Sequence, residues 1–202
     1  MKITHVETLL ACGSFATSAE WRSIRRRMHK AIQAVDWPVG SGKFTIYPES
    51  GKKRGKGNGV KPIKSELMKE LAVRGWKLEE PLDIAILQRP GKLDAVLYSK
   101  SGPVAFEWET GNISSSHRAL NKMALGLLKG VLICGMLVVP SRQLYRYLTD
   151  RIGNFPELQP YLDLWKVLPC RRGVLEIIVV EHDATSTDVP RVPKGTSGRA
   201  LS

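Results

Sequence analysis

Cysteine is scarce in this 202-residue sequence, and no segment of it resembles a membrane anchor. The three cysteines, Cys12, Cys134 and Cys170, are odd in number and lack the spacing of metal ligands, which argues against a disulfide framework or a zinc site. We expect them to be reduced and buried, in a cytoplasmic protein. No apolar run reaches transmembrane length, and residues 1–10 lack the basic and then apolar layout of a signal peptide. A role at a membrane is therefore the least expected.

The sequence also lacks the motifs of covalent catalysis and of nucleotide binding, because neither GxSxG nor GxxxxGK(S/T) occurs. His29, His117 and His182 fall on separate predicted elements, without a partner that would make them metal ligands. Acidic residues are few: 19 Asp and Glu face 31 Lys and Arg, which gives a net charge of +12. A basic balance of this size predicts a polyanionic partner, either nucleic acid or an acidic membrane surface.

Positive charge concentrates in two segments. One is a predicted amphipathic helix from Ser18 to Val35, whose cations form either a phosphate-contacting or partner-facing surface or only a solvated face. The other is the glycine-rich segment GKKRGKGNG, which is too polar to pack and predicts a mobile basic loop over residues 42–61. Such a loop could close on a DNA backbone, since phosphate contacts need charge more than fixed shape. The cations within GKKRGKGNG are Lys52, Lys53, Arg54 and Lys56.

The order of predicted elements is typical of an α/β fold in which helices flank a mixed central β-sheet. An antiparallel hairpin over residues 93–109 adjoins strands that are predicted to be parallel, among them the apolar run 131–140. We expect one domain over residues 1–182, and a disordered tail rich in Pro, Ser, Thr and Gly over residues 183–202. The other predicted elements are strands at 2–11, 76–88 and 173–181, and helices at 62–74, 114–128, 141–153 and 156–168.

The hairpin carries three acids that should converge. Glu107 and Glu109 alternate with Phe106 and Trp108, so the aromatic side chains take one face and the carboxylates the other. Folding about the turn at residues 100–102 sets Asp94 opposite the two glutamates. Carboxylates this close repel one another unless a cation lies among them, and hard oxygen ligands suit Mg²⁺ with a substrate phosphate. The alternative is a polar sheet face with three ordinary solvated acids.

With these residues in place, the chain resembles the type II restriction endonucleases of the PD-(D/E)XK superfamily, particularly the BamHI/BglII-like branch. In that superfamily a helix bearing an acid precedes a hairpin bearing Asp and then (D/E)xK, and the branch replaces the lysine by Glu or Gln. Asp94, Glu107 and Glu109 match the three hairpin positions, over an order of elements that spans roughly residues 60–140. Two features depart from the pattern: Leu93 stands where most members have Pro, and the helical acid is either Glu66 or Glu70.

The resemblance implies roles for these residues. Asp94 and Glu107 would bind Mg²⁺, for which Mn²⁺ is expected to substitute, and Glu109 would orient the attacking water or act as general base. Glu66 would hold a metal-bound water. Lys122 either supplies the lysine missing from the motif or is a surface residue. Phosphates beside the cut would contact Arg118 and Lys122, while base recognition stays open among Asn112, Arg142 and the basic loop.

Three functions are compatible with this pattern. The first is a homodimeric, Mg²⁺-dependent endonuclease that hydrolyses phosphodiester bonds of double-stranded DNA at a short palindrome, with one subunit cutting each strand. The second is a DNA repair or junction-resolving nuclease of the same superfamily that reads DNA shape. The third is a catalytically inactive DNA-binding protein. The third is the weakest of these, because a pure binder gains nothing by pointing three carboxylates at phosphates.

Overall fold

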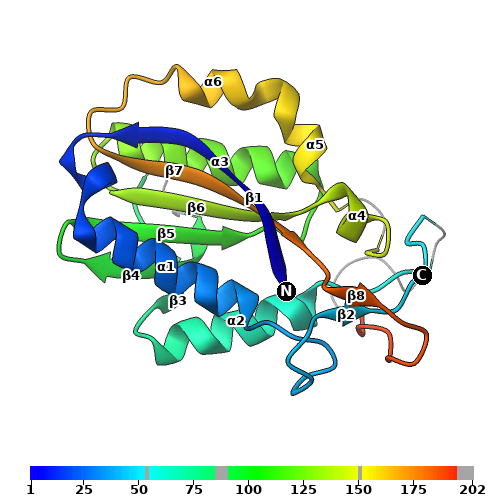
Figure 1. Ribbon diagram of the computed structural model, residues 1–202. Helices are drawn as coiled ribbons and strands as arrows, with labels where there is room; N and C mark the ends of the chain where they lie inside the picture. The colour runs from blue at the N-terminus through cyan, green and yellow to red at the C-terminus, as the bar shows by residue number, and fades with distance from the viewer. Residues whose placement is uncertain (53–54, 85–90, 150–151, 195–202) are drawn as a thin grey trace.

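A mixed β-sheet forms the centre of the computed structural model, which describes residues 1–52, 55–84, 91–149 and 152–194. Its six strands lie in the order β1-β7-β6-β5-β4-β3 (Figure 1). The strands β5, β6 and β7 are parallel, whereas β4 pairs antiparallel with β5 and β3, and β1 pairs antiparallel with β7. The predicted α/β fold with a mixed sheet is thereby confirmed. The strands are β1 (Lys2–Cys12), β3 (Lys77–Pro81), β4 (Lys92–Ser99), β5 (Gly102–Trp108), β6 (Cys134–Pro140) and β7 (Gly173–Glu181).

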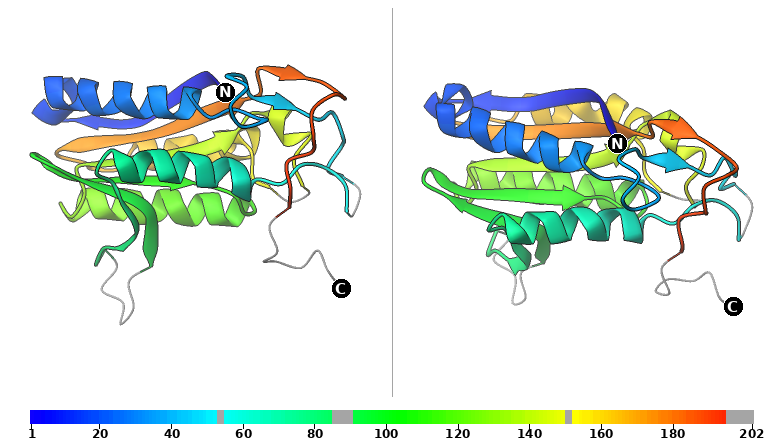
Figure 2. Two further views of the ribbon diagram at one scale, coloured as in Figure 1. Left: turned by 90° about the horizontal axis from the view of Figure 1, so that it is seen from below. Right: turned by 60° about the horizontal axis from the view of Figure 1, so that its bottom comes forward.

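Helices cover both faces of this sheet, as Figures 1 and 2 show. On one face α1 (Ala19–Gln33) and α2 (Lys61–Val73) pack into one hydrophobic cluster with Phe106 and Trp108. On the other face α3 (Ile113–Leu128) and α6 (Leu162–Lys166) pack into a second cluster. The Ser18 side chain caps α1 by accepting a hydrogen bond from the Trp21 N–H at 3.0 Å, as the sequence predicts. Short helical segments complete the fold: η1 (Ser14–Thr17), α4 (Arg142–Tyr145), α5 (Phe155–Leu158) and η2 (Gln159–Tyr161).

The helix predicted over residues 141–153 is wrong beyond its first turn, because α4 ends at Tyr145. Hydrogen bonds to a distant segment replace the helical ones. The carbonyl of Tyr147 accepts from the Asn58 N–H, and the Thr149 N–H donates to the Asn58 carbonyl. The strand expected at 76–88 is confirmed in part: β3 covers Lys77–Pro81, residues 82–84 lie beyond its end, and residues 85–90 lie outside the described residues.

The polar segment 42–61 packs more than its composition suggests. The side chain of Asn58 is fully buried, donating to the carbonyls of Tyr47 and Tyr147 at 2.9 Å each and accepting from the Val192 N–H at 3.1 Å. A polar residue can be buried when its hydrogen bonds are satisfied in this way. The expectation that the glycine-rich segment 51–59 is too polar to pack is therefore wrong around Asn58.

The predicted disordered tail also begins too early. Residues Ala184–Thr185 form β8, which pairs parallel with β2 (Thr45–Ile46), and Val192 is buried. The indole N–H of Trp37 donates to the Pro190 carbonyl at 2.7 Å. These contacts order residues 183–194, contrary to the prediction, whereas residues 195–202 lie outside the described part of the chain. No helix within the described ranges is long and apolar enough to cross a bilayer.

Candidate active site

The β4–β5 hairpin brings the predicted acids together. The antiparallel register pairs Ala95 with Phe106, so the next pair toward the open end is Asp94 with Glu107. Phe106 and Trp108 are buried against α1 and α2, which leaves the intervening carboxylates on the opposite side of the strand. The alternation predicted for this ribbon therefore holds, and it aims the acids at a cavity of about 950 Å³ between the sheet edge, α2 and α3.

Asp94 is held by three contacts. Its Oδ2 accepts a hydrogen bond from the Trp108 N–H at 2.8 Å, and its own N–H lies 3.4 Å from Oε2 of Glu107. Its Oδ1 lies 2.5 Å from the ammonium nitrogen of Lys64, which α2 delivers to the cavity wall. The side chains of Lys64 and Asp94 are only 22% and 13% exposed, so this ion pair is shielded from bulk water.

Glu107 is paired with a second lysine. Its Oε1 lies 2.6 Å from Nζ of Lys122, and that ammonium also donates to the carbonyl of Lys92 at 2.8 Å. Burial, and after it the nearby Asp94 carboxylate, raise the pKa of Glu107 from 4.5 to about 7, although Lys122 partly offsets both effects. A carboxyl group in this environment gains from any additional cation.

Glu109 extends the line of acids beyond the end of β5. Its backbone N–H donates to the Val138 carbonyl, and its Oε1 accepts from the Gly111 N–H at 2.5 Å. Burial raises the pKa of Glu109 above its usual value, the Gly111 hydrogen bond lowers it, and Asp94 raises it again. The raised pKa makes this group a stronger base than a solvated glutamate, as a general base requires.

The helical acid predicted from the resemblance is not in this cavity. Glu66 forms an ion pair with Lys69 at 2.9 Å, and Glu70 forms one with Arg74, so both acids lie on the outer side of α2. Glu66 follows Lys64 by two residues, which is about 200° around an α-helix, so the two side chains cannot face the same cavity. The structure therefore brings neither Glu66 nor Glu70 to the acid cluster.

Lys64 is the residue that sequence reasoning missed. It precedes Leu67 and Leu71 by three and seven residues, so it lies in the buried stripe of α2. A lysine in such a stripe needs a buried anionic partner, and this signal was present in the sequence.

The predicted DNA contacts occupy different environments. Arg118 lines the cavity beside the acids, at the first turns of α3. The side chain of Asn112 is the N-cap of α3 and accepts from the Ser115 N–H at 3.2 Å. Arg142 lies over the ring of Tyr145 on α4, outside the cavity lining.

In the basic loop, Lys56 forms an ion pair with Glu49 at 3.5 Å, and Lys52 is exposed. Lys53 and Arg54 lie outside the described residues. The cationic helix is divided in a similar way: Arg25 pairs with the buried Glu176 at 3.1 Å, while Arg22, Arg26, Arg27 and Lys30 are exposed.

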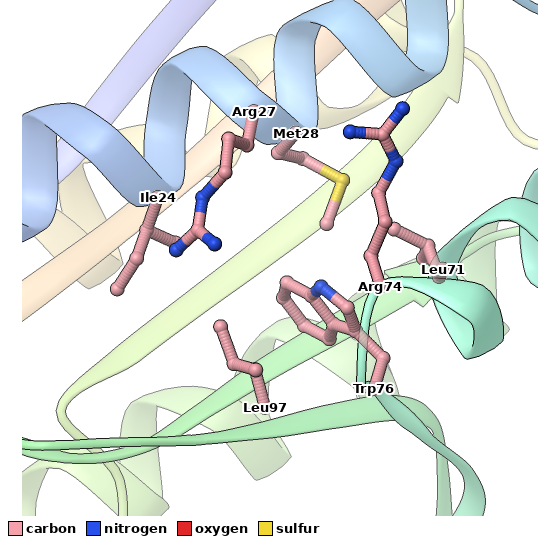
Figure 3. A pocket seen from close by; sticks show the side chains of 7 residues that line it. All are labelled: Ile24, Arg27, Met28, Leu71, Arg74, Trp76 and Leu97. Carbon is pink, nitrogen blue, oxygen red and sulfur yellow. The ribbon is translucent and has the colours of Figure 1, made fainter.

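A second cavity, between α1, α2 and β4, does not compete as a reaction site. It measures about 10 Å³, and Figure 3 shows Met28 and Trp76 facing each other across it, with no carboxylate among its seven lining residues. Space of this size holds no more than a water molecule.

The carboxylate cluster fits Mg²⁺ better than a metal that needs a complete protein cage. In the described ranges no three His, Cys, Asp or Glu side chains are arranged to hold a metal ion by themselves. Asp94 and Glu107 offer two hard oxygen donors in a cavity wide enough for a phosphate. Mg²⁺ commonly takes one or two carboxylates and completes its shell with waters and substrate phosphate oxygens.

Comparison with known proteins gives consistent matches. Residues 1–199 match the family described as restriction endonuclease BamHI. The type II restriction enzyme OkrAI of Oceanobacter kriegii is 47% identical over 201 residues, covering 100% of both chains. The type II restriction enzyme BamHI of Bacillus amyloliquefaciens is 39% identical over 170 residues, 80% of this chain and 75% of that one.

The fold is also similar to that of a solved structure. A crystal structure of restriction endonuclease BglII complexed with a DNA 16-mer gives a TM-score of 0.61 and covers 95% of this chain and 88% of that one. The sequence identity is 11%, so this likeness concerns the fold alone.

Proposed function

Because the chain belongs to the BamHI restriction endonuclease family, we propose that it cuts both strands of a short palindromic DNA site as a Mg²⁺-dependent homodimer. Membership makes it a site-specific deoxyribonuclease, a DNA-binding hydrolase of a restriction system. The metal, the symmetry of the site and the dimer are the proposed part. The observation that carries the proposal is the pairing of Asp94 with Glu107 at the wall of the large cavity, with Glu109 beside them.

Each acid has a separate role in this proposal. Asp94 and Glu107 would hold the divalent ion, which lowers the pKa of a bound water and neutralises charge developing on the phosphate. Glu109 would accept the proton of the attacking water, for which its raised pKa suits it. Arg118 and Lys122, on one side of α3, would bind phosphate oxygens next to the scissile bond.

A dimer would place one such site on each DNA strand. The chain exposes an apolar surface where α3 and α6 run beside each other, and Leu164 and Val167 are 64% and 77% exposed there. An exposed apolar surface of this kind favours association, and a second copy of the chain is the occupant that a two-fold symmetric substrate requires. The other large side chains of this surface are Leu128 and Tyr161.

The experiment that tests the function is plasmid cleavage in Mg²⁺ by the wild type, by Glu107→Ala and by Glu66→Ala. The last is a matched control, because it removes an acid of α2 that lies outside the cavity. We expect discrete fragments from the wild type and from Glu66→Ala, and none from Glu107→Ala. End-mapping of the fragments then gives the recognition site and shows whether it is palindromic.

Other outcomes would contradict the proposal at different points. A smear that is lost in Glu107→Ala would indicate a nuclease that reads DNA shape. Retained cleavage by Glu107→Ala would remove this residue from the metal site. Absence of cutting by every variant, with salt-sensitive DNA binding intact, would leave an inactive DNA-binding protein.

A further inference from the structure

The lysine on Asp94 lies where a metal ion would have to bind. Asp94 uses Oδ2 to accept from the Trp108 N–H, which fixes the carboxylate and leaves Oδ1 as the oxygen that faces the cavity. Lys64 places its ammonium 2.5 Å from that Oδ1. A bound Mg²⁺ lies about 2.0–2.1 Å from its ligand oxygens, so the ion and the ammonium compete for one side of the same atom.

The two lysines of the site are attached differently. The ammonium of Lys122 bridges Glu107 and the Lys92 carbonyl, at 2.6 and 2.8 Å. The ammonium of Lys64 makes no second hydrogen bond to a residue of the described ranges. Its side chain is 22% exposed and ends at the cavity wall. A lysine has a flexible four-carbon stem, so this ammonium can leave Asp94 by rotation within the side chain.

We propose that Lys64 is a cation placeholder: its ammonium occupies the metal position at Asp94 in the metal-free protein and is displaced when the divalent ion binds. This inference rests on the proposed metal site. It assigns Lys64 a positioning role, because the lysine keeps the Asp94 carboxylate neutralised and oriented until metal arrives. A displaced ammonium can then bind a DNA phosphate, so DNA and metal favour each other's binding.

The test measures Mn²⁺ binding without DNA, by the electron paramagnetic resonance signal of free Mn²⁺, for four proteins. They are the wild type, Lys64→Gln, Asp94→Asn and the control Lys69→Gln, which removes an exposed lysine of the same helix. A neighbouring charge commonly changes the affinity of a carboxylate for a proton about tenfold or more, so we expect Lys64→Gln to bind Mn²⁺ about tenfold more tightly. Lys69→Gln should match the wild type.

The design separates failure of this inference from failure of the metal site itself. If Asp94→Asn binds Mn²⁺ as well as the wild type does, the proposed metal site is wrong. If Asp94→Asn weakens binding while Lys64→Gln leaves it unchanged or weaker, only the placeholder role is overturned.

A second measurement is made on the wild type and uses a variant only to assign one signal. The lysine ammonium of the wild type is followed by NMR while Mg²⁺ is added, with assignment from Lys64→Arg. Displacement predicts that the Lys64 signal moves to the position of a solvated ammonium, at the Mg²⁺ concentration that saturates the site. A Lys64 signal that stays hydrogen-bonded at saturation would overturn the proposal.

Discussion

Replacing Glu107 by Gln should stabilise the metal-free protein at alkaline pH while abolishing cleavage. Glu107 is largely buried beside Asp94, and the pKa of about 7 shows that the folded protein disfavours its ionised form. Glutamine has nearly the same shape and carries no charge at any pH. The substitution therefore removes an unfavourable buried charge together with a proposed metal ligand, as is common where function and stability conflict.

The magnitude follows from the pKa. A rise from 4.5 to about 7 corresponds to about 3 kcal/mol against the ionised carboxylate. Because the folded-state pKa lies above the unfolded-state value, the protonated carboxyl stabilises the folded protein fully below pH 4.5, and this stability is lost as pH rises through 7. Glutamine stays neutral, so the variant keeps that stability at pH 8, reduced by the cost of leaving Lys122 with one acceptor. We expect the free energy of unfolding to exceed that of the wild type by about 1–3 kcal/mol at pH 8, and to match it at pH 4.

The assay is urea unfolding in EDTA at pH 4 and pH 8, for the wild type, Glu107→Gln and Glu66→Gln. The last makes the same chemical change at an acid outside the cavity and should alter stability little at either pH. Added Mg²⁺ should raise the stability of the wild type more than that of Glu107→Gln, because a ligand stabilises only the state that binds it. A Glu107→Gln protein that is no more stable than the wild type at pH 8 would refute the reasoning.

Three further predictions follow from the site and the fold. Because protons compete with the metal for the Glu107 carboxyl, whose pKa is about 7, Mn²⁺ affinity should fall as pH drops below 7 and level off above it. A Mn²⁺ affinity that stays constant from pH 6 to 8 would contradict this. Asn58→Ala should lower the free energy of unfolding by about 2–3 kcal/mol in urea, since it leaves the buried Val192 N–H without its acceptor and removes one of the two donors to the Tyr47 and Tyr147 carbonyls. The exposed Gln143→Ala serves as its control, and equal losses in both would argue against the burial of Asn58. Leu164→Glu should convert a dimer to a monomer in analytical ultracentrifugation, whereas the control Val73→Glu, which changes an exposed residue of α2, should not. An unchanged dimer in Leu164→Glu would exclude the apolar surface beside α3 and α6 as the dimer interface.

The central hairpin was predictable because its geometry is local. A turn at residues 100–102 and a period of two are sufficient to place Asp94 against Glu107, and the observed register, which pairs Ala95 with Phe106, puts those two acids next in line. The order of helices and strands followed from apolar periodicity in the same way. The rotation of α2 was also encoded locally, since Lys64, Leu67 and Leu71 form one stripe, whereas the acid that the family resemblance implies, Glu66, lies outside that stripe.

The packing of the polar segments could not be read from composition. Asn58 contacts Val192 across 134 residues, and both belong to stretches whose Gly, Pro and Ser content is typical of loops. Low hydrophobicity limits how much apolar area a segment can bury, yet here backbone hydrogen bonds to one buried amide fix both segments. Those partners are set by the tertiary fold, so local patterns predicted neither the end of α4 nor the ordered residues 183–194.

The charge balance of the cavity explains how an acid cluster can accept a polyanion. Asp94, Glu107 and Glu109 would repel phosphates, but Lys64 and Lys122 neutralise two of the three, which leaves a site of about one net negative charge. A divalent ion in place of Lys64 would bring that balance to about zero, and the released ammonium would add to the attraction for DNA. Metal and DNA should therefore bind cooperatively, each weakly alone. Cooperativity of this kind would confine the reactive state to the DNA-bound protein, which is where a nuclease needs it.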